Sequence, residues 1–420
     1  METKKEKVKL AILFQEEEAR EIDLLHPELG NPGVGGTAFC FILLMKYLDL
    51  RPEIDMTVYS FQKNNLPCQN CKYVSSIEEA LGEIEKDKKE VVLLRNHQED
   101  SVYEALKKHA LKYIVWMHNK LSYPEIKLFS EMKSVRRIIS VSREMYDYYI
   151  DDTIIEKMDY IWNIFVPPSK EKVRGSNQTK NVTFMGSLTY DKNFHLLTDV
   201  WKRIVEEVPT AKLHVIGSGK LYDKHSVMGK YGIAEKEYEE RFMPGICDDS
   251  GNVLDSVVFH GILGDEKYDV MKESAVGVAN PMATETFCLV AIEMEACGVP
   301  VVSRRKNGLV DTVKSGETGI LYSDISELPT AIIQLLKDEE LNETMGEKAK
   351  EFARNFFLPE HIIPKWILIM QQVAANEPAR YQKPEQNFDN NGKRIRQILH
   401  GIHRIPFLRW VPSIHDLQKK

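Results

Sequence analysis

Short apolar runs alternate with helix-favouring segments along most of this chain, and this alternation limits its possible folds more than any other feature. The runs at 8–14 and 91–94 have the length of buried strands, and 38–48 and 77–85 favour helices. Further strands are predicted in this half at 56–61, 113–117, 137–141 and 160–165. Strands that alternate with helices predict a parallel sheet with helices on both faces.

A second series of the same kind starts after a polar segment that contains Pro167 and Pro168. Strands are predicted at 181–185 and 213–216, with a helix at 193–207 between them. A chain of 420 residues is also too long for one ordinary core. We therefore expect an α/β protein with two doubly wound, Rossmann-like domains. The expected segments are a first domain at 1–166, a linker at 167–180, a second domain at 181–360, a C-terminal helix and connection at 361–392 that packs on the first domain, and a tail at 393–420.

Charge and cysteine content exclude several classes of protein. A net charge of -7 is not that of an evident nucleic-acid binder. Six cysteines do not indicate a disulfide scaffold; Cys68 and Cys71 are expected to be reduced thiols on a loop, the alternative being a metal site. No apolar run reaches the roughly 18–20 residues that span a bilayer. The charged residues 1–9 lack the apolar segment of a secretion signal, so we expect a cytoplasmic protein.

A strand–loop–helix–strand unit at 275–302 carries two glutamates, Glu285 and Glu293. The apolar run 275–279 ends in a turn, and the helix-favouring residues that follow end at Gly298. Glu285 thus lies in the loop at the carboxyl end of a strand, where open parallel sheets bind ligands.

The start of the helix in this unit suits a phosphate group, because the N–H groups there lack helical partners and carry partial positive charge. The candidate amides are those of Thr286, Phe287, Cys288 and Leu289. Glu285 could accept hydrogen bonds from sugar hydroxyls, and Glu293 could reach a ribose. The alternative is that both glutamates are ordinary helix residues. Phosphate, sugar and ribose together describe a nucleotide sugar.

Two motifs follow this helix, Gly298-Val299-Pro300-Val301-Val302 and Gly316-Glu317-Thr318-Gly319. Together with the paired glutamates, they make the segment 280–319 resemble the donor-binding region of family 4 of the retaining glycosyltransferases, the glycosyl transferases group 1. The resemblance covers both halves of the chain and is specific from about residue 181 to 322. It implies the GT-B fold, in which two Rossmann-like domains face each other across a cleft, and a nucleotide-diphosphate-sugar donor.

The resemblance implies roles for three residues of the first half. Gly35 and Gly36 end a glycine-rich loop where family members carry a Gly-Gly pair that faces the donor; the alternative is a tight turn that packs a helix on a sheet. His118 follows the strand 113–117, where the family places a polar residue that contacts the donor sugar or the acceptor. A lone histidine at a strand end is otherwise more often structural.

The loop after the strand 181–185 contains Gly186, Ser187 and Lys192. In the family an arginine follows the glycine and a lysine comes five residues later, so Lys192 fits and Ser187 departs from the pattern. Fixed cations would stabilise a diphosphate leaving group; the alternative for Lys192 is a solvated lysine at a helix start. Arg305 or Lys306 could compensate for the missing arginine.

The expected activity is retaining, metal-independent transfer of a sugar from a nucleotide-diphosphate-sugar to a glycan, lipid-linked or small acceptor. The expected catalytic residues are Glu285, Lys192 and His118. No Asp-x-Asp metal motif is present in the sequence, and neither a metal nor another cofactor is expected. Two alternatives stay open: another GT-B-type enzyme, such as a nucleotide-sugar epimerase, or a non-catalytic sugar- or nucleotide-binding protein.

The tail at 393–420 is basic and amphipathic. It contains one acid, Asp416, against seven Lys or Arg, at 393, 394, 396, 404, 409, 419 and 420. Apolar residues repeat at helical spacing and are followed by types that settle at a lipid interface: Ile395, Ile398, Leu399, Ile402, Phe407, Leu408 and Trp410. Two interpretations stay open. The tail attaches the protein to the anionic inner face of a membrane, or its apolar stripe packs on the first domain as core.

Overall fold

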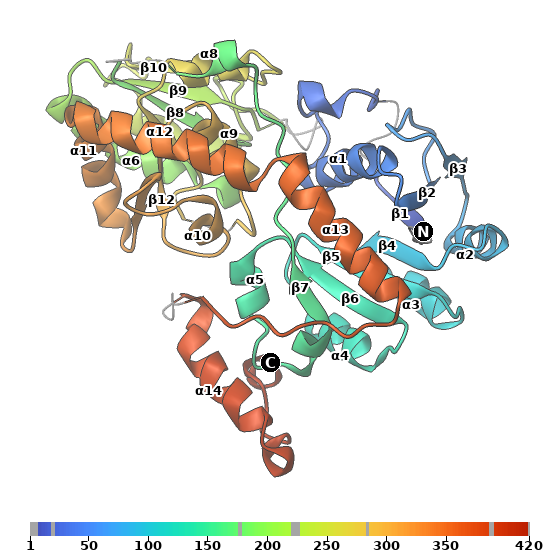
Figure 1. Ribbon diagram of the computed structural model, residues 1–420. Helices are drawn as coiled ribbons and strands as arrows, with labels where there is room; N and C mark the ends of the chain where they lie inside the picture. Colours follow the sequence, from blue (N-terminus) through green and yellow to red (C-terminus); the bar gives the residue numbers. More distant parts are fainter. Residues whose placement is uncertain are drawn as a thin grey trace. The chain divides into compact units, whose positions relative to one another are not determined.

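The computed structural model describes residues 7–17, 22–174, 179–219, 227–282, 285–385 and 390–418. The chain forms two compact units. Unit 1 consists of Met1–Ile164 and Pro359–Lys420, and unit 2 of Phe165–Leu358. Each unit is a parallel β-sheet covered by helices, as the alternation of strands and helices predicts (Figure 1).

The described part of unit 1 contains a seven-stranded parallel sheet in the order β3-β2-β1-β4-β5-β6-β7. Its strands are β1 (Val8–Phe14), β2 (Ile54–Ser60), β3 (Cys71–Tyr73), β4 (Val91–Arg95), β5 (Lys112–Met117), β6 (Val135–Ser140) and β7 (Met158–Tyr160). Its first helices are α1 (Gly36–Asp49), α2 (Ile77–Lys86), α3 (Asp100–Lys107), α4 (Tyr123–Glu131) and α5 (Arg143–Asp147). The central strands β1 and β4 bury almost all of their side chains, as expected for strands covered on both faces.

The end of the chain belongs to unit 1. Helix α13 (Pro359–Ala374) contacts α1, β1 and β4, and its Trp366 packs edge-on against Trp116, with ring centroids 4.9 Å apart. Two further helices follow, α14 (Lys393–His403) and α15 (Ile414–Leu417) (Figure 1). In the part of the chain that the structure describes, no helix has both the length and the apolar character needed to cross a bilayer.

The described part of unit 2 contains a six-stranded parallel sheet in the order β10-β9-β8-β11-β12-β13. Its strands are β8 (Asn181–Met185), β9 (Lys212–Ile216), β10 (Val257–Gly261), β11 (Val276–Val278), β12 (Val301–Arg304) and β13 (Gly319–Tyr322). Its helices are α6 (Phe194–Glu207), α7 (Lys236–Phe242), α8 (Lys267–Lys272), α9 (Leu289–Ala296), α10 (Leu309–Thr312), α11 (Leu328–Lys337) and α12 (Glu339–Phe356).

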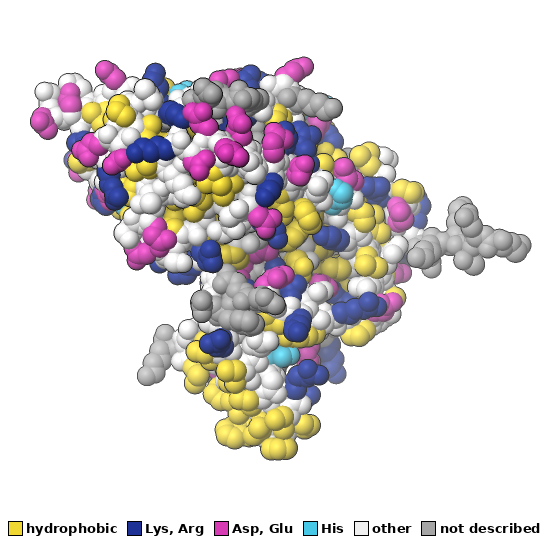
Figure 2. Space-filling model, turned by 60° about the vertical axis from the view of Figure 1, so that its left-hand side comes forward, with side chains coloured by type: hydrophobic (Ala, Val, Ile, Leu, Met, Phe, Trp, Pro, Cys, Tyr) yellow, Lys and Arg dark blue, Asp and Glu magenta, His cyan; other side chains and the backbone are white. Residues whose placement is uncertain are grey.

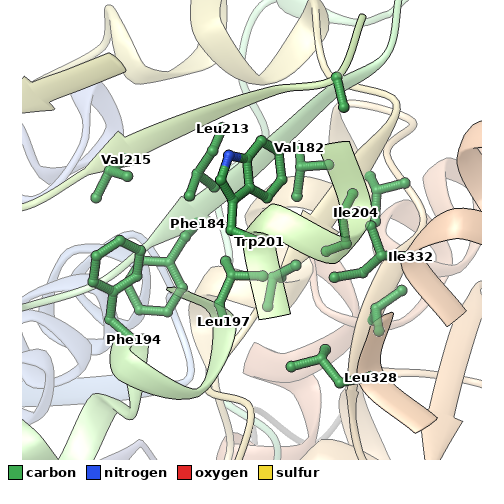
Figure 3. Close-up of a cluster of buried hydrophobic side chains, with 14 of the residues drawn as sticks. Val182, Phe184, Phe194, Leu197, Trp201, Ile204, Leu213, Val215, Leu328 and Ile332 are labelled. Carbon is green, nitrogen blue, oxygen red and sulfur yellow. The ribbon is translucent and has the colours of Figure 1, made fainter. Parts of the chain in front are cut away.

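The core of unit 2 forms where α6 and α11 pack against each other and against the sheet. Figure 3 shows Phe194, Leu197, Trp201 and Ile204 of α6 among side chains of β8, β9 and α11. The indole N–H of the buried Trp201 donates a hydrogen bond to Ser256 Oγ at 3.0 Å, so burial leaves this polar group satisfied. This packing holds the start of α6, and with it the loop after β8, in a fixed position.

Each sheet has a point at which the chain changes the direction in which it adds strands. In unit 1 this point lies between β1 and β4, and in unit 2 between β8 and β11. The loops after two such strands leave toward opposite sides, which opens a crevice at the carboxyl ends of the strands. In unit 2 these are the loops 186–193 and 279–288, which contain most of the predicted site residues.

Two local predictions were wrong. The last strand of unit 1 is Met158–Tyr160 and not 160–165, because the chain makes one more bond to the sheet, from Ile161 N to Ser140 O, and then leaves it. Cys71 begins the edge strand β3 and does not lie in a loop. Both Cys68 and Cys71 are free thiols.

The segment predicted as a polar linker packs on unit 2 over its described first part. Arg174 is buried, and its guanidinium donates to Ser274 O and to Asn342 Oδ1 at 3.2 and 2.7 Å. This arginine therefore ties the start of unit 2 to its own body. Residues 175–178 of the predicted linker lie outside the described residues, as do Lys419 and Lys420 of the tail.

Candidate functional site

The loop after β8 is fixed by a close backbone approach to the loop after β9. Gly186 N donates to Ile216 O at 3.0 Å. A Cβ atom at Gly217 would lie 1.9 Å from Gly186 O, and Gly217 has φ +132°. Only glycine fits both the space and the backbone conformation there. The loop 186–193 therefore starts from a rigid base.

An ion pair joins this loop to the loop after β11. Lys192 ends the short helix η5 (Tyr190–Lys192), and its Nζ lies 2.7 Å from Glu285 Oε1. Both side chains are only partly exposed. Two residues that were predicted independently, from separate motifs, therefore meet at the point where the strand order reverses.

A buried asparagine, Asn280, organises this pair. Its Nδ2 donates to Glu285 Oε1 and to Asp191 O, each at 3.0 Å. Its Oδ1 accepts a hydrogen bond from Asn193 Nδ2 at 2.9 Å. In the sequence Asn280 belongs to the turn after the run 275–279, and this role was not predicted. The available signal was its place directly after a buried strand and five residues before Glu285.

The predicted phosphate-binding amides lie at the start of α9. Cys288 adopts a left-handed conformation with φ 79° and precedes the first helical residue, Leu289. Phe287 is buried against Phe357, with ring centroids 5.8 Å apart. Burial raises the pKa of the Cys288 thiol, so this cysteine stays protonated near pH 7.

The segment that follows β12 holds the turn before α9 in place. Gly308 N donates to Glu285 O at 3.0 Å, and a Cβ at Gly308 would lie 2.1 Å from Thr286 O. Only a glycine permits this approach. The backbone that carries Glu285 and Thr286 is therefore held by its neighbours, and its N–H groups present partial positive charge at the crevice.

The second glutamate of the pair, Glu293, lies on α9 and is held by a lysine. Lys267 Nζ on α8 lies 2.6 Å from Glu293 Oε1, and both side chains are largely buried. The nearby Tyr268 has a raised pKa because of its burial and because of the negative charge of Glu293. Lys267 was not predicted, because in the sequence it is an ordinary residue at a helix start.

The Gly316–Gly319 turn is anchored by the second glutamate of α9, Glu295. Thr318 Oγ1 donates to the buried Glu295 at 2.6 Å and accepts from Lys314 N. Burial raises the pKa of Glu295 well above its ordinary value, which the hydrogen bond from Thr318 and the charge of Lys314 only partly oppose. This carboxyl therefore acts in packing the motif against α9.

His118, Gly35 and Gly36 belong to unit 1. Gly35 caps the N-terminus of α1, and Gly36 is its first residue. His118 is buried directly after β5, with its ring 4.5 Å from that of Trp116 and 6.2 Å from that of Phe41 on α1. Burial, together with the positive charge of Arg95, lowers the pKa of His118 to about 3. The imidazole is therefore neutral near pH 7.

An ion pair missed by the sequence analysis lies at the crevice of unit 1. Arg95 Nη1 at the end of β4 lies 3.0 Å from an oxygen of Glu16, which follows β1 and is buried. Arg95 ends β4 and Glu16 closely follows β1, and these two buried strands are neighbours in the sheet. That position was the signal that sequence reasoning could have used.

The remaining predicted residues lie in unit 2. Ser187 is buried, and its Oγ is 3.0 Å from Thr189 Oγ1, so the serine that replaces the arginine of the family pattern bonds within its own loop. Arg305 bonds Ser315 Oγ at 3.4 Å, and Lys306 is exposed. Among the described residues, no group of three or more His, Cys, Asp or Glu is arranged to hold a metal ion.

The chain is similar to known glycosyltransferases. The family described as Glycosyl transferases group 1 matches residues 167–352. The N-acetyl-alpha-D-glucosaminyl L-malate synthase of Bacillus anthracis is 38% identical over 95 residues, which are 22% of this chain and 25% of that protein. A D-inositol 3-phosphate glycosyltransferase of Corynebacterium jeikeium is 30% identical over 181 residues, 43% of this chain and 40% of that protein. The chain thus spans less than half the length of these two relatives.

Solved structures show the same fold over most of the chain. HepE of Anabaena in complex with UDP and glucose has a TM-score of 0.63 at 17% identity and covers 86% of this chain and 99% of its own. The sucrose-phosphate synthase of Thermosynechococcus elongatus has a TM-score of 0.67 at 16% identity, covering 87% and 99%. The match of residues 167–352 and the two parallel sheets confirm the predicted resemblance to the glycosyl transferases group 1, a GT4-type family, and the GT-B fold.

Proposed function

We propose that this protein is a retaining glycosyltransferase that moves a sugar from a nucleotide-diphosphate-sugar to a glycan, lipid-linked or small acceptor. The observation that carries the proposal is the Lys192–Glu285 ion pair at the carboxyl ends of β8 and β11, next to the start of α9. A cation, a carboxylate and a helix N-terminus together match a diphosphate bonded to a polyhydroxyl ring.

The proposed chemistry is stabilisation of the leaving group. As the bond between sugar and diphosphate breaks, negative charge grows on the diphosphate oxygens. Lys192 and the N–H groups at the start of α9 would oppose that charge without reorganisation, because Asn280 and Gly308 hold their loops in place. Glu285 would accept hydrogen bonds from hydroxyls of the transferred sugar and fix its orientation.

Glu293 is proposed to bind the ribose. Lys267 holds Oε1 of this carboxylate, and a carboxylate has enough lone pairs to accept further hydrogen bonds from two hydroxyls. In unit 1, a neutral His118 would donate or accept one hydrogen bond at the donor sugar or the acceptor without adding charge. Gly35 and Gly36 would let the backbone approach the donor closely.

The names of similar proteins suggest where to look for substrates. Two relatives are named for L-malate and for D-inositol 3-phosphate, and HepE was solved with UDP and glucose. A UDP-sugar donor is therefore the first to test, with small hydroxylated acceptors beside glycans and lipid-linked sugars. We propose that transfer needs no bound metal and takes place in the cytoplasm, at the inner face of the membrane if the acceptor is lipid-linked.

A thermal-shift panel of UDP-, GDP- and ADP-sugars, each with excess EDTA, tests this proposal. A donor at 100 times its dissociation constant stabilises the folded chain by about 2.7 kcal/mol. The matching donor should keep its effect in EDTA and lose most of it in Glu285→Gln, whereas Glu206→Gln, at an exposed position of unit 2, should behave like the wild type. Stabilisation that appears only with added magnesium or manganese contradicts the metal-free mechanism. No stabilisation by any donor contradicts the proposed function.

A further inference from the structure

The polar side of α14 faces the body of unit 1. Lys393 and Arg396 are only 1% and 2% exposed. Lys393 Nζ lies 2.5 Å from Glu144 Oε2 and 2.9 Å from Asp147 Oδ2, and Arg396 Nη1 lies 2.7 Å from Asp151 Oδ1. Burial lowers the pKa of Lys393, but the two carboxylates outweigh burial and raise it overall. These two basic residues are therefore bound inside the protein.

The apolar side of α14 faces away from unit 1. At about 100° per residue, Ile395, Ile398 and Ile402 lie on the side of the helix opposite to Lys393 and Arg396. Ile395 and Ile398 are each 60% exposed. A helix on a globular protein normally buries its apolar stripe and exposes its charges. Here that orientation is reversed, which contradicts the expectation that this stripe is core.

The segment after α14 extends the exposed apolar surface. Ile405, Phe407 and Trp410 are 39%, 75% and 77% exposed. Figure 2 shows hydrophobic side chains gathered at the lower end of the molecule, where Figure 1 places α14 and the end of the chain. We call residues 393–418 the C-terminal hairpin, because His403 Nε2 and Val411 O, 2.8 Å apart, join its two arms.

One buried carboxylate holds both ends of the C-terminal hairpin. Asp151 Oδ1 accepts from Arg396 in the first arm, and Asp151 Oδ2 accepts from Ile414 N in the second arm, both at 2.7 Å. Asp416 accepts from Tyr123 and pairs with Lys127 on α4. The base of the hairpin is thus fixed by polar contacts, while its apolar tip is left without cover from unit 1.

Hydrophobic burial within this chain does not explain that arrangement. Burying a cation costs several kcal/mol, and the attraction within its ion pair roughly offsets this cost. The buried ion pairs of Lys393 and Arg396 therefore add little to the free energy of unfolding. Leaving several large apolar side chains in water gains nothing. A contiguous apolar surface of this kind is typical of a site that another surface covers.

The charges of the C-terminal hairpin favour an anionic partner. Its exposed charged side chains, within the described range, are Arg394, Arg404 and Arg409, and its acid Asp416 is paired with Lys127. A symmetric contact with a second copy would bring these arginines together and be repelled. Isoleucine, phenylalanine and tryptophan flanked by arginine fit the interface of an anionic bilayer, where aromatic rings and the cationic ends of arginine side chains settle.

We propose that the C-terminal hairpin is an interfacial membrane anchor, which inserts Ile395, Ile398, Phe407 and Trp410 into an anionic lipid surface. Asp151 and its neighbours keep the hairpin in the orientation that presents these side chains. The anchor does not depend on the proposed transferase activity, because vesicle binding is measured without donor or acceptor.

Vesicle flotation of the full chain tests the anchor. Phosphatidylcholine vesicles with phosphatidylglycerol should bind the wild type, and vesicles without it should bind it weakly. The double change Phe407→Ala with Trp410→Ala should weaken binding by about a hundredfold. Replacing Arg394, Arg404 and Arg409 by Gln should weaken binding to the anionic vesicles by about a hundredfold. Leu50→Ala, at an exposed leucine elsewhere in unit 1, is the matched control and should bind like the wild type.

A second measurement needs no destabilising change. Emission of the wild type should shift to the blue on addition of anionic vesicles, and Trp410→Phe should remove the shift, since Trp116, Trp201 and Trp366 are buried and the partly exposed Trp162 lies outside the hairpin. Absence of vesicle binding by the wild type overturns the proposal, as does wild-type binding by the Phe407 and Trp410 variant with an unchanged melting temperature. A concentration-dependent dimer that this variant abolishes, without vesicle binding, would assign the surface to a second copy instead.

Discussion

Lys192 and Glu285 form an ion pair with 2.7 Å between Nζ and Oε1, although 93 residues separate them in the chain. The pair exists because β8 and β11 are neighbours in the sheet, so that the loops after both strands meet. The lysine proposed to bind the diphosphate is therefore held by the glutamate proposed to bind the sugar before any donor arrives.

This pairing predicts non-additive effects of mutation. Lys192→Met and Glu285→Gln should each lower kcat/KM by about a hundredfold or more, because each removes a charge or acceptor needed in the transition state. The double variant should lose much less than the product of the two single losses, since each single change already disturbs the remaining partner. Lys212→Met, at an exposed lysine of unit 2, is the control. Fully multiplicative losses would show that the two residues act independently.

The arginine of the family pattern should not be tolerated at Ser187. This side chain is buried and bonded to Thr189, so Ser187→Arg would force a guanidinium into the packed loop after β8. We expect a lower melting temperature and no gain in transfer, whereas Ser187→Ala should stay close to the wild type. A more active and equally stable Ser187→Arg would mean that the loop opens toward the donor.

Glu295 should make stability depend on pH. Its folded pKa is raised, so above the ordinary pKa of 4.5 the folded state keeps a proton that the unfolded state has released. The contribution is complete below that ordinary value and is lost as pH rises toward the folded pKa. Each pH unit between the unfolded and the folded pKa changes the free energy of unfolding by about 1.4 kcal/mol. The free energy of unfolding of Glu295→Gln, relative to that of the wild type, should therefore increase from pH 5 to pH 8, as measured by chemical denaturation. A constant difference would refute the assignment.

Most strands of the two sheets could be predicted because buried parallel strands are continuous apolar runs, such as 8–14 and 91–94. Glu285 and Lys192 could be predicted because each belongs to a motif of local spacing. Asn280 and Lys267 could not, because their roles depend on which strands and helices become neighbours. The reversed orientation of α14 could not be predicted either. Its periodicity identifies an apolar stripe, but it does not show that acidic residues within 144–151 bind the basic side of the helix.

His118 should not titrate in the range in which most histidines do. Its pKa of about 3 implies that protonation is absent above about pH 5, so the pH profile of kcat/KM should show no step near 6.5 that His118→Asn removes. Activity of His118→Asn should be lower at every pH, with an unchanged profile shape. Because the folded pKa is depressed, the stability from neutral His118 is present above 6.5 and is lost as pH falls toward 3. A step near 6.5 that disappears in the variant would contradict the buried, neutral imidazole.

The stereochemistry of the product tests the proposed function most directly. The full chain is incubated in EDTA with the donor that stabilises it and with a hydroxylated acceptor, and the anomeric configuration of the new bond is read by NMR as nucleoside diphosphate is released. Retention of the donor's configuration, with transfer lost in Glu285→Gln, is the predicted result. An inverted product, or release of an isomerised sugar without acceptor, would contradict it.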